Sequence, residues 1–272
     1  MESLFNLGHQ TAVITGGSGV LGRAMARALA QAGARVAVLS RRAEACEEVA
    51  ANIRTQGGEA IGVACDVLDR AALEDAAVQV VTAFGPVDIL VNGAGGNQPP
   101  ATVSPENSFF DLPASAIDDV FGLNFKGTFQ SCQVFGRAMA ERKQGSIVNI
   151  VSVASLRPLT RVVAYGAAKA AVVNFTQWLA VHIAQTYSPN LRVNAIAPGF
   201  FLTEQNRFLL TDAQTGALTT RGQSILAHTP RGRFGAPEDL IGTLLWLVSP
   251  ASTFVTGIVV PVDGGFSAFS GV

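Results

Sequence analysis

The chain has 272 residues, of which 49% are hydrophobic and only 14% are charged, and its formal net charge is −1. This length fits one large α/β domain or two small ones, and the composition supplies a large core and excludes an intrinsically disordered chain. A nearly neutral chain offers no basic surface for nucleic acid, although a site for a small charged substrate needs only one or two local cations.

Short apolar runs alternate with helical patterns along the chain. Such runs, without polar alternation, are typical of strands buried on both faces, and repeated strand–helix units imply a parallel sheet with right-handed crossovers. In chain order, the predicted strands are residues 11–15, 35–39, 59–64, 88–91, 146–151, 191–196 and 258–261. The predicted helices are residues 19–32, 43–56, 70–84, 117–142 (as one or two helices), 165–186 and 237–248.

No linker rich in Pro, Gly or Ser divides these elements. The sequence therefore predicts a single α/β domain over residues 1–272, a three-layer, doubly wound sheet of Rossmann type with about seven parallel strands. The alternation of strands and helices is interrupted at residues 200–235, a segment too long for an ordinary connection, so we expect a substrate-loop insertion there.

The remaining composition excludes several other classes of protein. Cys46, Cys65 and Cys132 are widely spaced, as are the three histidines, so we expect free buried thiols and no metal site. Residues 1–5 lack the basic segment and apolar run of a signal peptide. Residues 240–262 carry no charge, but Pro250 interrupts them, which favours a buried helix and a strand over a membrane span. We expect a cytoplasmic protein without a membrane segment.

A glycine-rich turn joins the first predicted strand to the first predicted helix. Glycines let a ligand approach the main chain closely, and a helix that begins there points free N–H groups at an anion. After the first strand of an α/β chain, this combination indicates a site for a dinucleotide pyrophosphate. The turn reads Thr15-Gly16-Gly17-Ser18-Gly19-Val20-Leu21-Gly22.

The end of the second strand bears on which dinucleotide binds. An acidic residue there would bind the ribose hydroxyls of NAD(H), whereas a basic residue would accept the 2′-phosphate of NADP(H). The sequence reads Ser40-Arg41-Arg42, and guanidinium groups pair well with phosphate. We therefore predict a preference for NADP(H), with NAD(H) as the alternative if both arginines only face solvent.

Three side chains are candidates for proton-transfer chemistry, and the alternative for each is an ordinary structural role, as a helix-face aromatic, a solvated cation and a strand-end hydroxyl. Tyr165 and Lys169 are four residues apart on a predicted helix and share a face, and Ser152 follows a predicted strand, where α/β proteins place their ligand sites. Tyrosine titrates near pH 10, so its pKa must fall by about 3 units, worth roughly 4 kcal/mol, for proton exchange near neutrality. A nearby ammonium and an oxidised nicotinamide ring could supply that stabilisation.

Over its whole length the chain resembles the short-chain dehydrogenase/reductase family. The motifs that carry the resemblance occur in the family's order. They are the glycine-rich turn at residues 15–22, Asp66-Val67, Asn92-Gly93-Ala94-Gly95, Asn124, Ser152, Tyr165-xxx-Lys169, Pro198-Gly199 and Asp263-Gly264-Gly265.

The resemblance implies a catalytic role for four residues. Tyr165 would be the general acid in carbonyl reduction and the base in alcohol oxidation. Lys169 would lower its pKa and hold the nicotinamide ribose. Ser152 would hydrogen-bond the substrate carbonyl, and Asn124 would anchor a water molecule of the proton relay.

The resemblance also implies the cofactor contacts. Asp66 and Val67 would face the adenine, and Pro198 and Thr203 would lie near the nicotinamide amide. The other residues of the cofactor site would be Asn92, Gly93, Ala94, Gly199 and Phe200. The chain departs from the family at two places. The middle glycine of the family's turn falls at Val20, with Gly19 one place early, and Asn92-Gly93 replaces the commoner double Asn.

Several segments are further similar to the subgroup of D-mannonate oxidoreductases, or fructuronate reductases, which implies D-mannonate and D-fructuronate as the substrate pair. These segments are residues 92–97, 157–160, 175–179, 197–207, 228–235 and 265–272. A sugar acid requires partners for its carboxylate and hydroxyl groups. The candidates, chosen because they lie in loops after strands or in the insertion, are Asn97, Arg157, Gln205, Asn206 and Arg207.

Other functions remain open at this point. A 3-oxoacyl thioester reductase or a gluconate 5-dehydrogenase-like enzyme would keep the chemistry and change the substrate. A cofactor-sensing binding protein would keep the fold without turnover. The resemblance also implies a homotetramer assembled through the long helices and the C-terminal strand.

Overall fold

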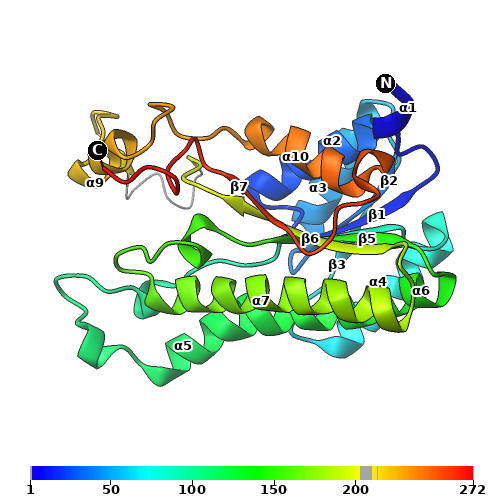
Figure 1. The fold of residues 1–272 in the computed structure, drawn as a ribbon, viewed down its shortest axis with the longest axis horizontal. Helices are drawn as coiled ribbons and strands as arrows, with labels where there is room; N and C mark the ends of the chain where they lie inside the picture. Colours follow the sequence, from blue (N-terminus) through cyan, green and yellow to red (C-terminus); the bar gives the residue numbers. More distant parts are fainter. Residues whose placement is uncertain (1, 203–209, 213, 272) are drawn as a thin grey trace.

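The fold was analysed in a computed structural model, which describes residues 2–202, 210–212 and 214–271. Seven strands form one sheet in which every neighbouring pair is parallel, in the order β3-β2-β1-β4-β5-β6-β7 (Figure 1). The predicted sheet is thus confirmed. The strands are β1 (Thr11–Thr15), β2 (Arg35–Ser40), β3 (Ala60–Ala64), β4 (Ile89–Asn92), β5 (Gly145–Ile150), β6 (Leu191–Pro198) and β7 (Val259–Val262).

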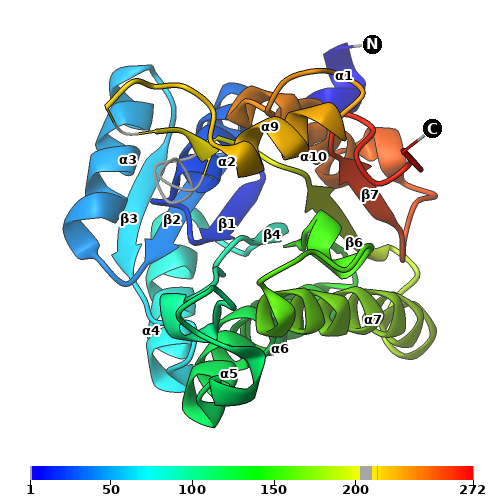
Figure 2. The same ribbon diagram turned by 90° about the vertical axis from the view of Figure 1, so that its left-hand side faces the viewer.

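Helices cover both faces of the sheet, with α2, α3 and α10 on one side and α4, α5, α6 and α7 on the other (Figures 1 and 2). Their bounds are α1 (Glu2–Phe5), α2 (Val20–Gln31), α3 (Ala43–Thr55), α4 (Arg70–Phe84), α5 (Ala114–Phe121), α6 (Gly127–Arg142), α7 (Val163–Thr186), α9 (Thr220–Ala227) and α10 (Ile241–Val248). Short 3-10 turns lie at η1 (Pro99–Ala101), η2 (Phe109–Asp111), η4 (Val153–Ser155), η5 (Pro237–Leu240) and η6 (Pro250–Ser252).

Two separate hydrophobic cores hold the three layers together. Successive side chains of a strand point to opposite faces, so Ile14 of β1 joins the core under α2, α3 and α10, while Val13 joins the core under α4, α6 and α7. This double burial explains why the strands read as continuous apolar runs. In the described part of the chain, no helix is long and apolar enough to cross a membrane.

The structure refines two predicted helices at places that matter for the site. The helical stretch predicted over residues 117–142 is continuous from α5 to α6 but contains a π-helical turn, η3 (Gly122–Lys126), in its middle. Such wide turns are frequent at functional sites, and this one holds Asn124. Helix α7 begins at Val163, two residues earlier than predicted, so Tyr165 lies in its first turn.

The close packing of α3 on β3 depends on Gly62. A Cβ at this position would lie 2.5 Å from the backbone N of Glu47 and 2.6 Å from the backbone carbon of Cys46. Because these are helix backbone atoms, they cannot move aside without separating α3 from the sheet. We therefore expect Gly62→Ala to lower the free energy of unfolding by about 1–3 kcal/mol, the usual cost of overpacking, measured by urea denaturation.

Gly242 in α10 provides the matched control. No atom lies within 4 Å of a Cβ built there, so Gly242→Ala should be neutral or stabilise the helix by up to about 1 kcal/mol. Equal stability changes in the two variants would contradict the packing argument.

Candidate active site

A cleft of roughly 700 Å³ lies at the carboxyl ends of the strands, and it includes the point between β1 and β4 where the strand order reverses. Doubly wound proteins bind ligands at this position. Eighteen of the residues expected to contact the cofactor line the cleft: Gly16, Ser18, Gly19, Val20, Leu21, Gly22, Ser40, Arg41, Arg42, Asp66, Val67, Gly93, Ala94, Tyr165, Lys169, Pro198, Gly199 and Phe200.

Other lining residues were missed in the sequence, although a simple signal could have found most of them. Most of them end a strand or lie in the loop after one, close to residues that had been selected. Leu123 instead precedes Asn124 in the π-helical turn. They are Cys65, Gly95, Gly96, Leu123, Ile150, Val151 and Phe201.

The glycine-rich turn is packed too closely for side chains at two positions. Gly16 has a φ of +67°, and a Cβ there would lie 2.7 Å from the backbone N of Ala94. At Gly22 a Cβ would lie 2.3 Å from the carbonyl oxygen of Gly16. The turn is further held by Arg23, whose Nε donates to the carbonyl of Ser18 at 2.9 Å. The main chain is therefore exposed to the cleft in a fixed conformation.

The displaced middle glycine of the turn is accommodated without strain. Gly19 is the N-cap of α2, with a φ of −74°, and a Cβ there would make only an ordinary contact of 3.4 Å with the oxygen of Gly16. Val20 is half-buried and is among the residues that line the cleft. The departure from the family's pattern thus adds a side chain to the wall of the cleft.

At the far end of the cleft, polar and basic side chains surround the end of β2. Ser40 accepts a hydrogen bond at 2.8 Å from the hydroxyl of Ser18, which ties this strand end to the glycine-rich turn. Arg41 and Arg42 are exposed, and neither forms an ion pair with another described residue. Two guanidinium groups are therefore free to meet an anion.

Lys169 is buried at the opposite end of the cleft, only 3% exposed. Its Nζ donates to the carbonyl oxygen of Ile150 at 2.8 Å, and it lies 5.8 Å from the centre of the Tyr165 ring. Gly95 lies between Lys169 and Asn124. A Cβ at this glycine would lie 2.9 Å from Nζ of Lys169 and 2.6 Å from Oδ1 of Asn124. The ammonium and the amide thus approach the same glycine.

Asn124 is fully buried within the π-helical turn and anchors the loop after β4. Its Nδ2 donates to the carbonyls of Gly96 (2.7 Å) and Val120 (2.8 Å), and its Oδ1 accepts from the N–H of Gly96 at 3.1 Å. Ser152 caps η4 by accepting from the N–H of Ala154 at 3.1 Å. All four predicted catalytic residues therefore lie at or directly behind the same wall of the cleft.

Burial shifts the acidity of both titratable groups toward their neutral forms. It lowers the pKa of Lys169 to about 8, from an ordinary value of 10.5. It also raises the pKa of Tyr165, and the hydrogen bond with Ser152 offsets only part of that increase. The lowering of the Tyr165 pKa that the resemblance implies for Lys169 therefore has to overcome the effect of burial, and it stays a prediction.

Some predicted site residues lie elsewhere. Gly17 packs against Val38 and does not line the cleft. Asn92 is buried beneath the cleft, where its Nδ2 donates to Oδ1 of Asn149 at 2.8 Å and to Sγ of Cys132 at 3.2 Å. The expectation that Asn92 faces the cofactor is therefore wrong for its side chain, because β4 directs that side chain into the sheet–helix interface.

The predicted substrate residues are divided between two situations. Asn97 donates to the Thr102 hydroxyl at 2.8 Å, and Arg157 donates through Nε to the carbonyl of Ser267 at 3.2 Å. Both side chains are exposed, and neither is among the residues that line the cleft. Thr203, Gln205, Asn206 and Arg207 lie outside the described residues.

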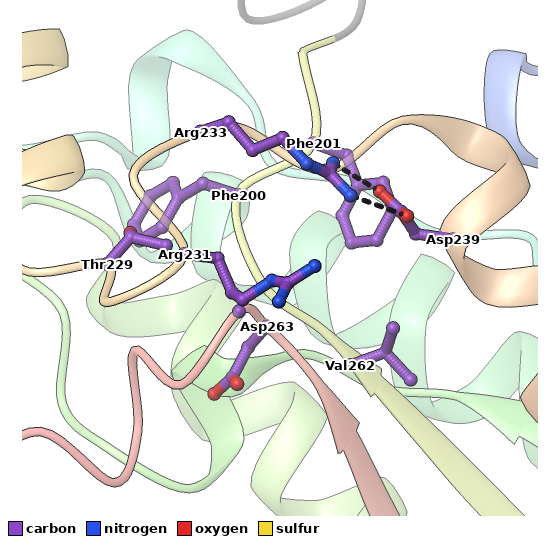
Figure 3. Close-up of a pocket in the computed structure, with 10 residues that line it drawn as sticks. Phe200, Phe201, Thr229, Arg231, Arg233, Asp239, Val262 and Asp263 are labelled. Carbon is purple, nitrogen blue, oxygen red and sulfur yellow. Dashed lines mark hydrogen bonds and ion pairs between the residues drawn. The ribbon is translucent and has the colours of Figure 1, made fainter.

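A smaller recess of roughly 200 Å³ adjoins the cleft and shares Phe200 and Phe201 with it (Figure 3). On its wall, Arg233 forms two hydrogen bonds to Asp239, at 2.6 and 2.8 Å. This pairing holds the pKa of Asp239 at about 2. The N–H of Gly235 donates to the carbonyl of Phe200, so the paired segment supports the backbone of the cleft from behind.

The fold and the cleft define a doubly wound α/β protein with a dinucleotide-type phosphate turn. Comparison with known proteins agrees. The sequence profile of the short chain dehydrogenase family matches residues 10–214. An uncharacterized oxidoreductase of Bacillus subtilis (strain 168), UxuB, is 52% identical over 276 residues that cover 98% of each chain.

Solved structures extend this similarity to the whole chain. A protein from Haemophilus influenza, provisionally named a D-mannonate oxidoreductase and holding NAD, has a TM-score of 0.93 and 43% identity, covering 100% of this chain and 99% of that chain. A gluconate 5-dehydrogenase from Burkholderia cenocepacia J2315, in complex with NADP and tartrate, has a TM-score of 0.88 and 31% identity, covering 98% of this chain and 99% of that chain. The chain belongs to the short-chain dehydrogenase family and is an oxidoreductase, as the resemblance predicted.

The buried charge of Lys169 should destabilise the cofactor-free protein. The group binds its proton near pH 8 when folded and near pH 10.5 when unfolded, so the cost is present in full below pH 8 and disappears as the pH rises to 10.5. The two pKa values differ by the equivalent of about 3 kcal/mol, and loss of the hydrogen bond to Ile150 offsets about 1 kcal/mol of it. We expect Lys169→Met to raise the free energy of unfolding by about 2 kcal/mol at pH 7 in urea denaturation, with no gain at pH 10.5.

Lys126 in η3 is the matched control, because its side chain is exposed. Lys126→Met should change the stability by less than about 0.5 kcal/mol at either pH. A Lys169→Met protein that is less stable than wild type at pH 7 would show that the ammonium is not buried at a net cost.

Proposed function

We propose that the protein is an NAD(P)-dependent oxidoreductase that interconverts a secondary alcohol and a ketone, with Ser152, Tyr165, Lys169 and Asn124 as its catalytic set. The observation that carries this proposal is the burial of Lys169 beside Tyr165 at the end of a cleft whose floor is bare main chain. Burying a lysine costs free energy and shifts its pKa, and such perturbed groups are typical of functional sites. The family membership supports the same reaction class.

The cleft fits a dinucleotide on steric grounds. At Gly16, Gly22 and Gly95 a side chain would collide with backbone or catalytic atoms, so the main chain stays open to a bulky anion. The start of α2 directs unpaired N–H groups and the positive end of the helix dipole at the same place. Gly16 to Gly22 would hold the pyrophosphate, Asp66 and Val67 would face the adenine, and Pro198, Gly199, Phe200 and Thr203 would lie near the nicotinamide.

Each catalytic side chain has a distinct task in the proposed reaction. The bound nicotinamide supplies or accepts the hydride. Tyr165 donates its hydroxyl proton to the carbonyl oxygen in reduction and removes the alcohol proton in oxidation, while Ser152 orients that oxygen by a hydrogen bond. Lys169 stabilises the tyrosinate electrostatically. Asn124 holds the loop at Gly96 in place and offers its amide to a water molecule of the proton relay.

The raised pKa of Tyr165 bears on how the tyrosinate forms during the reaction. Burial favours the neutral phenol, and the charge of Lys169 has to offset this effect for a tyrosinate to form near neutral pH. The positive charge of an oxidised nicotinamide in the same cleft would favour the tyrosinate further. Oxidation of the alcohol should therefore speed up as the pH rises, because the base form of Tyr165 is the reactive one.

We further propose that NADP(H) is preferred, with NAD(H) as a second cofactor. Arg41 and Arg42 line the cleft next to Ser40 and are not neutralised by a described acidic residue, which suits a 2′-phosphate. Both cofactors occur among the relatives, NAD in the structure from Haemophilus influenza and NADP in that from Burkholderia cenocepacia.

The test is the double variant Arg41→Ala/Arg42→Ala. We expect the KM for NADPH to rise at least about tenfold, since a hydrogen bond to a charged group contributes about 1.5–3 kcal/mol, whereas the KM for NADH should stay unchanged. Arg137→Ala serves as the control, because Arg137 is exposed on α6 away from the cleft. A wild-type enzyme that clearly prefers NADH would refute the preference.

For the substrate, we propose a sugar acid, with D-mannonate and D-fructuronate first and a gluconate/ketogluconate pair second. The support comes from the relatives, which include the provisional D-mannonate oxidoreductase and a gluconate 5-dehydrogenase holding tartrate, itself a hydroxy acid. Gln205, Asn206 and Arg207 keep their proposed role as carboxylate and hydroxyl partners. Asn97 is left with a structural role through its bond to Thr102.

Turnover of a defined panel tests the reaction and the substrate class together. D-fructuronate, 5-ketogluconate and an acetoacetyl thioester are each offered with NADPH and with NADH, and the cofactor absorbance is followed. We expect the two sugar acids to be reduced with higher kcat/KM than the thioester. Tyr165→Phe should lower kcat by about 10²–10⁴-fold, the usual contribution of a general acid.

Tyr187→Phe is the matched control, because Tyr187 is the other tyrosine and is exposed at the end of α7. A preference for the thioester would favour the 3-oxoacyl reductase alternative. A flat absorbance trace over the whole panel would instead favour a cofactor-sensing protein.

We propose a homotetramer as the working form of the enzyme. Helix α7 exposes large apolar side chains, among them Trp178 (56% exposed) and Val181 (57% exposed). Apolar side chains of this size, three residues apart on one long helix, suit burial against another subunit.

A further inference from the structure

The C-terminal tail, residues 263–271, follows β7 and lies beside α9 (Figure 1). A tight turn redirects it. Asp263 accepts hydrogen bonds from the N–H groups of Gly265 (2.9 Å) and Ser267 (2.8 Å), and Gly264 and Gly265 adopt positive φ values of 65° and 90°. The turn is held in place by the N–H of Arg231, which donates to the carbonyl of Gly264.

This turn places Phe266 against a residue of the cleft. The rings of Phe266 and Phe200 meet edge to face, with 5.0 Å between their centres and 71° between their planes. Phe200 lines the cleft together with Ser152 and Tyr165, whereas Phe266 is half-buried behind it. The tail therefore helps to position the ring of Phe200, which forms part of the cleft wall near Ser152 and Tyr165.

Two further contacts tie the tail to other segments of the chain. Arg157, in the loop after Ser152, donates through Nε to the carbonyl of Ser267 at 3.2 Å. On the other side, the ring of Phe269 lies 6.2 Å from the ring of His228, which follows α9. The tail thus contacts both the loop after β5 and the insertion after β6.

We propose that the C-terminal tail sets the substrate range of this site, with Phe266 and Arg157 as positioning residues and Phe200 as the wall that the substrate meets. The tail holds Phe200 so that the cleft admits a short polyhydroxy carbonyl compound, whose C–H groups pack on the ring, and excludes a longer acyl chain. The inference rests on the proposed function, because it specifies the size and character of that reaction's substrate. It also gives Arg157 a different task from the carboxylate contact expected from the sequence.

The experiment compares Phe266→Ala with wild type on two substrates, D-fructuronate and acetoacetyl-N-acetylcysteamine, with NADPH. Without the Phe266 ring, Phe200 can turn away and the cleft becomes longer. We expect the ratio of kcat/KM for the sugar acid to kcat/KM for the thioester to fall at least tenfold, mainly through a higher KM for the sugar acid. The Kd for NADPH, titrated by fluorescence without substrate, should stay within twofold.

Three further variants separate positioning from general damage. Phe266→Tyr keeps the ring and should restore the wild-type ratio. Arg157→Gln removes the guanidinium Nε donor and should move the ratio in the same direction as Phe266→Ala, by about threefold. Phe254→Ala removes a fully exposed phenyl ring elsewhere and should leave the ratio unchanged.

The outcomes also separate this inference from the proposed function. Equal changes on both substrates in Phe266→Ala, or a Phe266→Tyr variant as impaired as the alanine variant, would overturn the role of the tail. A wild-type enzyme that does not reduce sugar acids but does reduce dihydroxyacetone would refute the sugar-acid proposal. In that case the role of the tail is decided by the ratio of kcat/KM for dihydroxyacetone to kcat/KM for the thioester, compared between wild type and Phe266→Ala. A wild-type enzyme that reduces the thioester as well as the short ketones, or reduces none of them, overturns the inference.

Discussion

The hydrogen bond between the buried ammonium of Lys169 and the carbonyl of Ile150 is the contact on which the rest of the site depends. Ile150 is the last residue of β5, so its carbonyl is available at the carboxyl end of the sheet, where the pairing of β5 with β6 stops. A charge buried this deeply is tolerable only where a polar group faces it. The hydrogen bond therefore holds α7 against β5. Because Tyr165 lies one helical turn before Lys169, the same contact positions Tyr165 at the cleft.

A second polar contact between the same elements lies deeper in the interface. Asn149 donates to the hydroxyl of Thr176 at 2.9 Å and accepts from Asn92 at 2.8 Å. These groups connect β4, β5 and α7 beneath the cleft, and each is almost completely buried. Since buried polar groups need specific partners, the cluster permits one register of α7 on the sheet. This explains how Asn92 can matter to the site without touching a ligand.

The two ends of the cleft are built on different physical principles. The cofactor end uses bare main chain, because no Cβ fits at Gly16 or Gly22. The substrate end uses side chains from separate segments. Phe200, which follows β6, contacts Phe266 of the C-terminal tail, and the tail in turn contacts Arg157 of the loop after β5. Relatives that share the first arrangement can therefore bind similar cofactors and still differ in the alcohol that they oxidise.

The sequence by itself determined the parts of this protein that depend on local pattern. Apolar runs such as residues 11–15 indicated doubly buried strands, and the turn from Gly16 to Gly22 indicated a site for a dinucleotide pyrophosphate, because strand burial and glycine geometry act over a few residues. The reaction was implied by the family resemblance, which rests on the order of motifs that include Ser152, Tyr165 and Lys169. Tertiary structure decided what depends on distant segments. Only the packed sheet showed that Asn92 points away from the cleft, that Arg157 is bonded to Ser267, 110 residues further on, and that burial opposes the acidity expected of Tyr165. Strand orientation, loop contacts and desolvation arise when elements far apart in the sequence come together, and no local pattern encodes them.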